Sequence, residues 1–257
     1  MSYPSQSAAQ DKESQADERP PRRAENDVRE SGRWNRRVLW LLMGLTLGTG
    51  IVDAVGYLAL NHVFIGNMTG NVIILGMAIV GADKLPVLGP LLAMLCFSLG
   101  ASVTGIALRN NPSAWPGAVT GALLLAGGLV TSMGVLSLLL EDQPDTPAQL
   151  VMSSLSAVAM GMQAYVARKL AVRDVTTVVV TSTLTAFAGD LFIRPNVKSV
   201  ANRRAAAILA MLLGAAVGAV AVHLSTGFAL LGAGLIVVVV SLLGHFATKS
   251  ALAASDR

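Results

Sequence analysis

The sequence predicts an all-α polytopic membrane protein with six to eight transmembrane helices, arranged as two parallel four-helix repeats. Hydrophobic residues make up 53% of the 257 residues and charged residues only 13%, with a mean hydropathy of +0.62. A soluble domain of this length carries about twice that charge. The charges are also segregated, because residues 1–37 hold eight Lys/Arg and seven Asp/Glu whereas the rest holds eleven and eight.

A helix needs about 20 consecutive apolar residues to cross the hydrocarbon core of a bilayer. Strong candidates for such spans are residues 38–60, 63–80, 88–108, 118–140, 205–224 and 228–247. Two weaker candidates of about 17 residues, 150–166 and 175–191, are rich in Ser, Thr and Gly. Both counts, six and eight, place the two chain termini on the same side of the membrane.

The two ends of the chain are predicted to lie outside the membrane domain of residues 38–247. Residues 1–37 show no apolar periodicity, which predicts a disordered, charged cytoplasmic tail, and residues 248–257 form a second tail. The first apolar run begins at Val38 and is too long for a signal peptide. The single cysteine, Cys96, allows neither a disulfide framework nor a metal site.

Basic residues predict the orientation in the membrane. Seven arginines between Arg19 and Arg37 precede the first span, which by the positive-inside rule places the N-terminus in the cytoplasm. With eight spans, the residues that fall inside are Lys84, Arg194, Lys198, Arg203, Arg204 and Lys249, and those that fall outside are Arg109, Arg168, Lys169 and Arg173. The last three conflict with the rule, so either the weak pair of spans is misplaced or that loop folds back into the protein.

Three sequence matches in the same order indicate an internal repeat. Residues 50–53 resemble residues 161–163, and residues 99–103 match residues 213–217 at an offset of 114. Between them, the polar residues 67–71 align with the threonine-rich residues 176–183. The predicted repeats cover about residues 38–140 and 150–247. Four spans in each would make the halves parallel, with a polar segment in the second span of both.

The polar cluster Asn67-Met68-Thr69-Gly70-Asn71 lies within an apolar stretch and is the best candidate for a functional site. Hydrocarbon offers no partner for amides and hydroxyls, so these side chains need protein or a wet cavity. Two interpretations remain open. Either Gly66 and Gly70 form a packing seam for another helix, or they break the helix and expose backbone carbonyls to a solute.

Asp53 is the only carboxylate well inside a strong span, and such residues face protein or water. It is either a cation or proton site or a hydrogen-bonded residue that holds helices together. In the second half, Gln163 and the threonines Thr177 and Thr181 are candidates to line a pathway. The alternative for the threonines is hydrogen bonding to the carbonyls of their own helix.

Residues 50–60 (GIVDAVGYLAL) and 63–71 (VFIGNMTGN) resemble the YoaK family of bacterial multi-pass membrane proteins, whose central domain has no known function. Residues 160–163 (MGMQ) and the threonines from Thr176 to Thr185 resemble the second half of that family, so the similarity covers about residues 38–247. The sequence departs from the family at Ala164, where many relatives have Asn. The resemblance implies an integral protein of the bacterial inner membrane and implies no substrate.

These observations favour a small-solute permease or secondary transporter. Its pathway residues would be Asp53, Asn67, Thr69, Gly70, Asn71, Gln163, Thr177 and Thr181. The alternative is a non-transporting scaffold or a channel-like subunit of a larger assembly. An enzyme is not expected: Asp53 and Asp190 lack the sequence context of intramembrane aspartyl proteases, and no other catalytic constellation is present. We expect no cofactor, metal or nucleic-acid partner; the expected partners are the lipid bilayer, an unknown solute or ion and a second copy of the chain.

Overall fold

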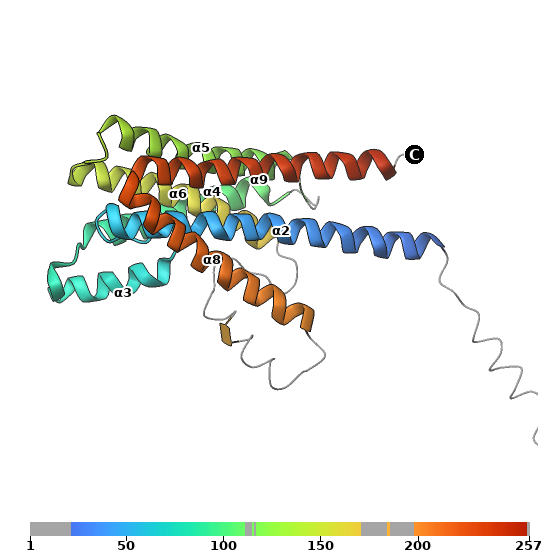
Figure 1. Ribbon diagram of the computed structural model, residues 1–257, viewed down its shortest axis with the longest axis horizontal. Helices are drawn as coiled ribbons and strands as arrows, with labels where there is room; N and C mark the ends of the chain where they lie inside the picture. Colours follow the sequence, from blue (N-terminus) through green and yellow to red (C-terminus); the bar gives the residue numbers. More distant parts are fainter. Residues whose placement is uncertain (1–21, 111–114, 116, 171–183, 186–197, 256–257) are drawn as a thin grey trace, which may run out of the picture. The chain divides into compact units, whose positions relative to one another are not determined.

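The computed structural model describes residues 22–110, 115, 117–170, 184–185 and 198–255. Every regular element in these ranges is a helix, as the all-α prediction requires (Figure 1). The chain divides into two compact units, residues 1–37 and residues 38–257. The membrane helices belong to the second unit, and their packing is described within it.

Six of the described helices are long and apolar enough to cross a membrane. They are α2 (Arg22–Ala59), α4 (Leu88–Leu108), α5 (Gly117–Leu139), α6 (Thr146–Leu170), α8 (Lys198–Leu224) and α9 (Thr226–Ser255). The membrane-crossing part of α2 begins at Arg36. The chain is therefore a multi-pass membrane protein, and the weaker candidate at residues 150–166 is a full crossing within the 25-residue helix α6.

The prediction of a full crossing over residues 63–80 is wrong. In its place the chain has a loop followed by α3 (Met68–Ile79), a helix of 12 residues. At 1.5 Å per residue this helix is about 18 Å long, too short for the hydrocarbon core. The short 3₁₀ helix η1 (Ala82–Lys84) follows it. The predicted span at residues 175–191 lies almost entirely outside the described residues.

Residues 22–37 also differ from the prediction, because they are helical rather than disordered and are continuous in sequence with the first crossing. Pro20 and Pro21 precede this helix, and no proline or glycine interrupts the sequence between Arg22 and Ser31. Proline favours helix starts, and the absence of breakers favours a helical conformation in the residues that follow.

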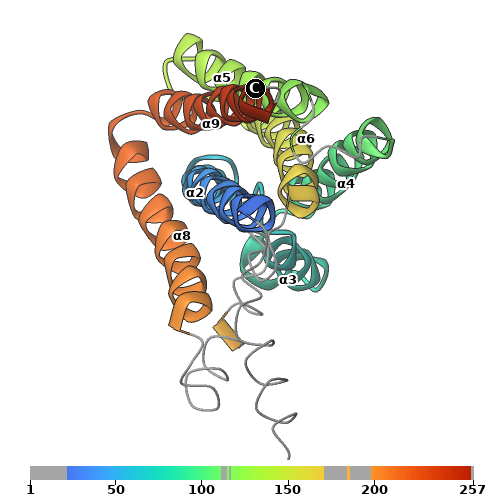
Figure 2. The same cartoon turned by 90° about the vertical axis from the view of Figure 1, so that its right-hand side faces the viewer.

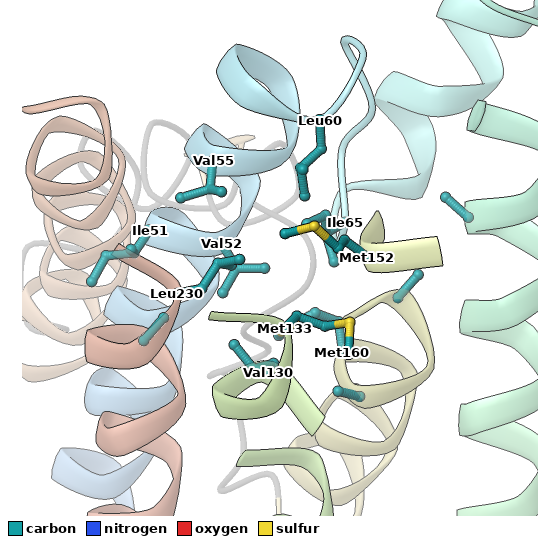
Figure 3. Close-up of a cluster of buried hydrophobic side chains, with 14 of the residues drawn as sticks. Ile51, Val52, Val55, Leu60, Ile65, Val130, Met133, Met152, Met160 and Leu230 are labelled. Atoms are coloured by element: carbon teal, nitrogen blue, oxygen red, sulfur yellow. The ribbon is translucent and has the colours of Figure 1, made fainter. Parts of the chain in front are cut away.

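The two most buried crossings are α2 and α6, each 61% buried, whereas α4 and α8 are only 22% and 17% buried. Within the second unit, seen along the helices, the part of α2 from Val38 onward lies between α8 on one side and α6 on the other (Figure 2). Val52 and Val55 of α2 converge with Met152 and Met160 of α6 in one apolar core (Figure 3). Side chains of α5, α9 and the loop after α2 complete this core.

Glycines let α2 approach α8 and let α6 approach α4. A Cβ atom at Gly50 would overlap the backbone of α8 at Met211 and Ala215, and one at Gly214 would overlap Leu47 of α2. The same pattern joins the other two helices: Gly161 of α6 meets Phe97 and Ala101 of α4, and Gly100 meets Val158. Residues 50 and 161, and residues 100 and 214, are pairs that the sequence comparison aligned.

The helices α5 and α9 also pack backbone to backbone, and they run antiparallel. Gly127 lies against Gly234, and Gly134 lies against Gly227, so the residue numbers rise on one helix as they fall on the other. Close backbone contact of this kind replaces the hydrophobic driving force that is missing between helices in lipid.

The two halves therefore differ from the expected parallel four-helix repeats. The first half contributes three long crossings, α2, α4 and α5, and the second half contributes three described ones, α6, α8 and α9. An even number of spans was the reason to expect parallel halves. Because α3 does not cross, the last crossings of the two halves, α5 and α9, run in opposite directions.

The bundle has two ends with different charges. At the first end α2 finishes and α4 and α6 begin, since Gly89 lies against Val63 and Leu150. This end carries Lys84, Glu141, Asp142 and Asp145. At the second end α4 and α6 finish side by side, where the Lys169 Nζ donates to the Leu108 carbonyl at 2.6 Å. This end carries Arg109, Arg168, Lys169, Lys198 and Lys249.

Candidate functional site

The candidate site is built around residues 60–67, which fold back along the last turns of α2. Asn61 and His62 both adopt left-handed backbone conformations, with φ of 62° and 57°, and so reverse the chain. Asn and His tolerate this region better than most residues. The loop then passes directly over Gly56, where a Cβ would overlap the Val63 carbonyl. The segment thus re-enters the bundle from the first end.

Asp53 holds the deepest part of this loop. Its Oδ1 accepts hydrogen bonds from three successive backbone N–H groups, those of Ile65 at 2.9 Å, Gly66 at 2.6 Å and Asn67 at 3.3 Å. Consecutive amides that converge on one oxygen form an anion-binding nest. Asp53 lies six residues before the end of α2, so α3 begins about 9 Å inside the bundle.

Asn71 holds the other side of the same loop. Its Oδ1 accepts from the Phe64 N–H at 2.9 Å, and its Nδ2 donates to the Phe64 carbonyl at 2.6 Å. Asn67 has a different role, since its Oδ1 accepts from the Gly70 N–H at 3.2 Å and caps the start of α3. A side-chain cap satisfies one of the orphan amides at a helix N-terminus. The loop is thus fixed by one residue of α2 and one of α3.

Gln163 links the second half to this region. Its Nε2 donates to the Thr49 Oγ1 at 2.9 Å and to the Leu45 carbonyl at 3.3 Å, both on α2. The Thr49 hydroxyl gives its own proton to the Leu45 carbonyl at 2.9 Å. Both groups on α2 are therefore acceptors toward Gln163. This fixes the orientation of its amide, with the nitrogen toward α2 and the oxygen away from these two groups.

Three buried side-chain atoms among the described residues have no hydrogen-bond partner: Asp53 Oδ2, Gln163 Oε1 and Ser156 Oγ. Asp53 is 5% exposed and Gln163 is 3% exposed. A buried acceptor without a donor costs about 1–3 kcal/mol, so each of these atoms needs a donor that the described residues do not supply. Two of the three belong to the residues that join the two halves.

The structure brings only some of the predicted pathway residues together. Asp53, Asn71 and Gln163 are buried at this site, whereas Asn67 and Thr69 are exposed. A Cβ at Gly70 would overlap the Phe64 ring, so Gly70 packs against the loop rather than against another helix. Thr177 and Thr181 lie outside the described residues.

The chain is not helical at Gly66, because α3 begins only at Met68, whereas Gly70 lies within α3 and does not break it. Exposure of this segment to a solute stays a prediction. The backbone groups presented by residues 65–67 are amides rather than the expected carbonyls, and they point at Asp53. Thr49, four residues before Asp53, was not among the predicted site residues. That i, i+4 spacing places both polar side chains on one face of α2 and was the available signal.

A second polar cluster lies at the first end of the bundle, around Asp142 in the turn between α5 and α6. Its Oδ1 accepts from the Ser137 hydroxyl at 2.8 Å and from the Gly227 N–H at 2.9 Å. Partial burial favours the neutral carboxyl, but hydrogen bonds from Ser225, Ser137 and Gly227 outweigh it and hold the pKa of Asp142 below its usual value. This cluster ties the α5–α6 turn to the start of α9.

The comparisons with known proteins agree with this architecture. The family model described as "Protein of unknown function (DUF1275)" matches residues 41–243. The UPF0700 transmembrane protein YoaK of Bacillus subtilis (strain 168) is 34% identical over 190 residues, which cover 72% of this chain and 82% of that protein. No solved structure matches. The chain therefore belongs to the DUF1275 family and is similar to the transmembrane protein YoaK.

Proposed function

We propose that this protein is a small-solute permease or secondary transporter. The observation that carries the proposal is the re-entrant segment of residues 60–79, in which a loop and a half-length helix replace a full crossing. Irregular backbone at membrane depth is tolerated only where it is buried in protein or lines a water-filled cavity. Transporters place such broken segments at their substrate and ion sites.

The position of the segment supports the same proposal. The start of α3 and the amides of residues 65–67 lie next to Asp53. Asp53 belongs to α2, and α2 contacts the second half of the chain through Gln163. Secondary transporters bind substrate and coupling ions at the interface between repeats, where half-helix ends face the ligand. Asp53, Asn71 and Gln163 are the residues to which we assign the pathway, with Asn67 capping the half-helix.

We further infer that the two halves are inverted repeats. The contact of Gly50 with Met211 and Ala215 has its counterpart in the contact of Gly161 with Phe97 and Ala101. The burial of the crossings also recurs, at 61%, 22% and 39% in α2, α4 and α5 against 61%, 17% and 50% in α6, α8 and α9. An exchange of these paired contacts would open the site alternately to the two sides of the membrane.

Both termini are proposed to lie in the cytoplasm of a bacterial cell, with the protein in the inner membrane. With α3 re-entrant, Arg109, Arg168 and Lys169 lie at the second end, where the crossing part of α2 begins. Among the described lysines and arginines of residues 38–257, only Lys84 lies at the first end. For Arg168 and Lys169 this arrangement agrees with the positive-inside rule, and Arg173 lies outside the described residues. In a Cys96→Ala background, cysteines at Lys84 and Gln143 should react with an impermeant maleimide on intact spheroplasts, and one at Asn110 only after permeabilisation. The reverse labelling pattern would overturn the orientation.

The permease itself is tested on the purified full chain in detergent by thermal shift at several pH values. The probes are Na⁺, K⁺, Mg²⁺, chloride, inorganic phosphate, amino acids, sugars and nucleosides, each added separately. We expect at least one to raise the Tm of the wild type and of Thr69→Ala, but not of Asn71→Ala or Gln163→Leu. The same compound should then show uptake in proteoliposomes.

The alternative function is a non-transporting scaffold or channel-like subunit. The shallow burial of α8, at 17%, favours it, because an apolar crossing with so little contact in its own chain is available to a partner or a second copy. If no probe shifts the Tm and light scattering shows a defined oligomer, the results would contradict the permease and support this alternative. In neither case do we propose an enzyme.

A further inference from the structure

We propose that Asp53 and Gln163 form a proton-binding site, in which Asp53 Oδ2 carries the proton and Gln163 Oε1 accepts its hydrogen bond. The proposal rests on the proposed transport function and deepens it, because it identifies the coupling ion as H⁺. It starts from the two buried acceptor oxygens that have no partner, one on each of the two central helices.

The two oxygens of Asp53 have opposite surroundings. Oδ1 accepts the N–H groups of residues 65–67, which favour a carboxylate. Oδ2 is buried without any donor, which disfavours a carboxylate because one of its lone-pair positions is desolvated and unpaired. The surroundings of Oδ1 therefore favour the charged form of Asp53, and those of Oδ2 favour the neutral form. A proton can be added at Oδ2 without displacing any hydrogen bond at Oδ1.

Gln163 is the acceptor that such a proton needs. Its Nε2 is committed to Thr49 and Leu45, so its amide cannot be turned over without placing an oxygen against two acceptors. Its Oε1 is therefore left as a buried acceptor in need of a donor. The Thr49 methyl and both Asp53 oxygens lie around Gly66, within 3.6 Å of the position that a Cβ would take there. Thr49 thus connects the two residues.

A proton fits this site better than a metal cation. A hard divalent cation takes six or more oxygen ligands, whereas only two unpartnered side-chain oxygens belong to this cluster of described residues. The described parts of the chain also contain no group of three or more His, Cys, Asp or Glu residues placed to hold a metal ion. The two acceptor oxygens, one of them on the titratable Asp53, lack a single donor between them, and a proton supplies it.

No other described charge competes with Asp53 at this position. The buried polar residues of α6, Ser153, Ser156 and Gln163, are uncharged, and α3, α4 and α5 carry no Asp, Glu, Lys or Arg along their lengths. His62, in the loop, is exposed and its ring bonds to the Tyr57 carbonyl at 3.1 Å. His223 and His245 lie at the ends of their crossings. Uptake of one proton from water therefore neutralises an isolated charge.

Protonation also has a mechanical consequence. Hydrogen bonds to a carboxylate are roughly twice as strong as bonds to a neutral acceptor. Loss of the charge therefore weakens the hold of Asp53 on residues 65–67, while the new bond to Gln163 ties α2 more closely to α6. The re-entrant loop is released and the two halves are joined in the same step, which is the exchange that proton coupling requires.

The test is infrared difference spectroscopy of the full chain in lipid nanodiscs during a pH titration. We expect a titrating C=O stretch of a neutral carboxylic acid, lost in Asp53→Asn and retained in the control Asp142→Asn. In Gln163→Leu the band should persist at higher frequency, because the acid has lost its hydrogen-bond acceptor. An unchanged band in Asp53→Asn, no such band in the wild type, or an unshifted band in Gln163→Leu would each overturn the proton site.

A second readout follows the loop. In a Cys96→Ala background, maleimide labelling of Thr69→Cys, normalised to an exposed Gln143→Cys control, should rise severalfold at low pH. When Asp53→Asn is combined with Thr69→Cys, the Asn side chain resembles the protonated acid. The labelling rate of Thr69→Cys should then stay at the higher value at all pH values. A normalised rate independent of pH in the wild type would overturn the coupling of proton and loop. Neither readout needs a substrate, so a protein that shows both but transports no probe would contradict the permease and not the proton site.

Discussion

The side-chain amide of Asn71 is paired with the backbone of Phe64 through two hydrogen bonds, at 2.9 and 2.6 Å. This contact closes a loop of eight residues around the start of α3, and Asp53 closes the same loop from the side of α2. The polar cluster at residues 67–71 therefore helps to hold a chain reversal inside the membrane. The acceptor oxygens that remain without a partner around it belong to Asp53 and Gln163.

Replacing Asn71 by Ala should destabilise the protein by about 2 kcal/mol or more, because two backbone groups of Phe64 lose their partners in a region without water. Thermal unfolding in detergent measures the effect as a lowered Tm. Thr69→Ala is the matched control, since Thr69 is exposed two residues away and should be neutral. Equal stability of the two variants would contradict the clamp.

Asp53→Asn and Asp53→Ala should behave differently. Asn keeps an acceptor for the three amides and offers an N–H₂ group toward Gln163, so we expect normal folding and a Tm close to that of the wild type. Ala leaves the amides of residues 65–67 unpaired, at about 1–3 kcal/mol for each one that water cannot reach. If thermal unfolding showed both variants to be equally stable, the amide nest would have no structural role.

Gly161→Ala should be strongly destabilising, because its Cβ would overlap the Phe97 carbonyl of α4. Overpacking of this kind costs about 1–3 kcal/mol. Gly50→Ala should cost a similar amount, since it meets the equivalent residues of α8. At Gly128 a Cβ has nothing within 4 Å, so Gly128→Ala should be neutral or slightly stabilising. Urea or thermal unfolding of the three variants measures these differences in stability. A Gly128→Ala variant destabilised as much as the other two would contradict the role of close helix packing.

Acid should loosen the contact between the α5–α6 turn and the start of α9. The folded-state pKa of Asp142 is held below its unfolded value, so its stabilising effect is present above the unfolded pKa and disappears as the pH falls through the folded pKa. The wild type should lose stability in this acidic range, and Asp142→Asn should lose less over the same range. Glu141→Gln, an exposed neighbour, is the control. Parallel pH profiles of Tm for the wild type and Asp142→Asn would refute this.

Much of the membrane architecture follows from the sequence alone. Apolar length identifies five of the six strong spans and the weaker one that became α6, because about 20 apolar residues in lipid have few alternatives to a helix. Periodic matches between the halves mark Gly50, Gly100, Gly161 and Gly214, which the structure places at the closest helix contacts. Asp53 and Asn71 were predicted as site residues because uncompensated polarity in an apolar stretch is costly wherever it lies, and Gln163 because it lies in the sequence match between the halves.

What only the tertiary structure decides is where those polar groups find their partners. Residues 63–80 have the hydropathy of a span, yet the loop turns inward because Asp53 and Asn71 can satisfy its backbone and no water can. The inward turn held by these contacts reduces the number of crossings in the first half from the predicted four to three, so that its last helix, α5, runs opposite to α9. Hydropathy measures transfer from water to lipid for each segment, whereas the choice between crossing and returning depends on hydrogen bonds between residues far apart along the fold.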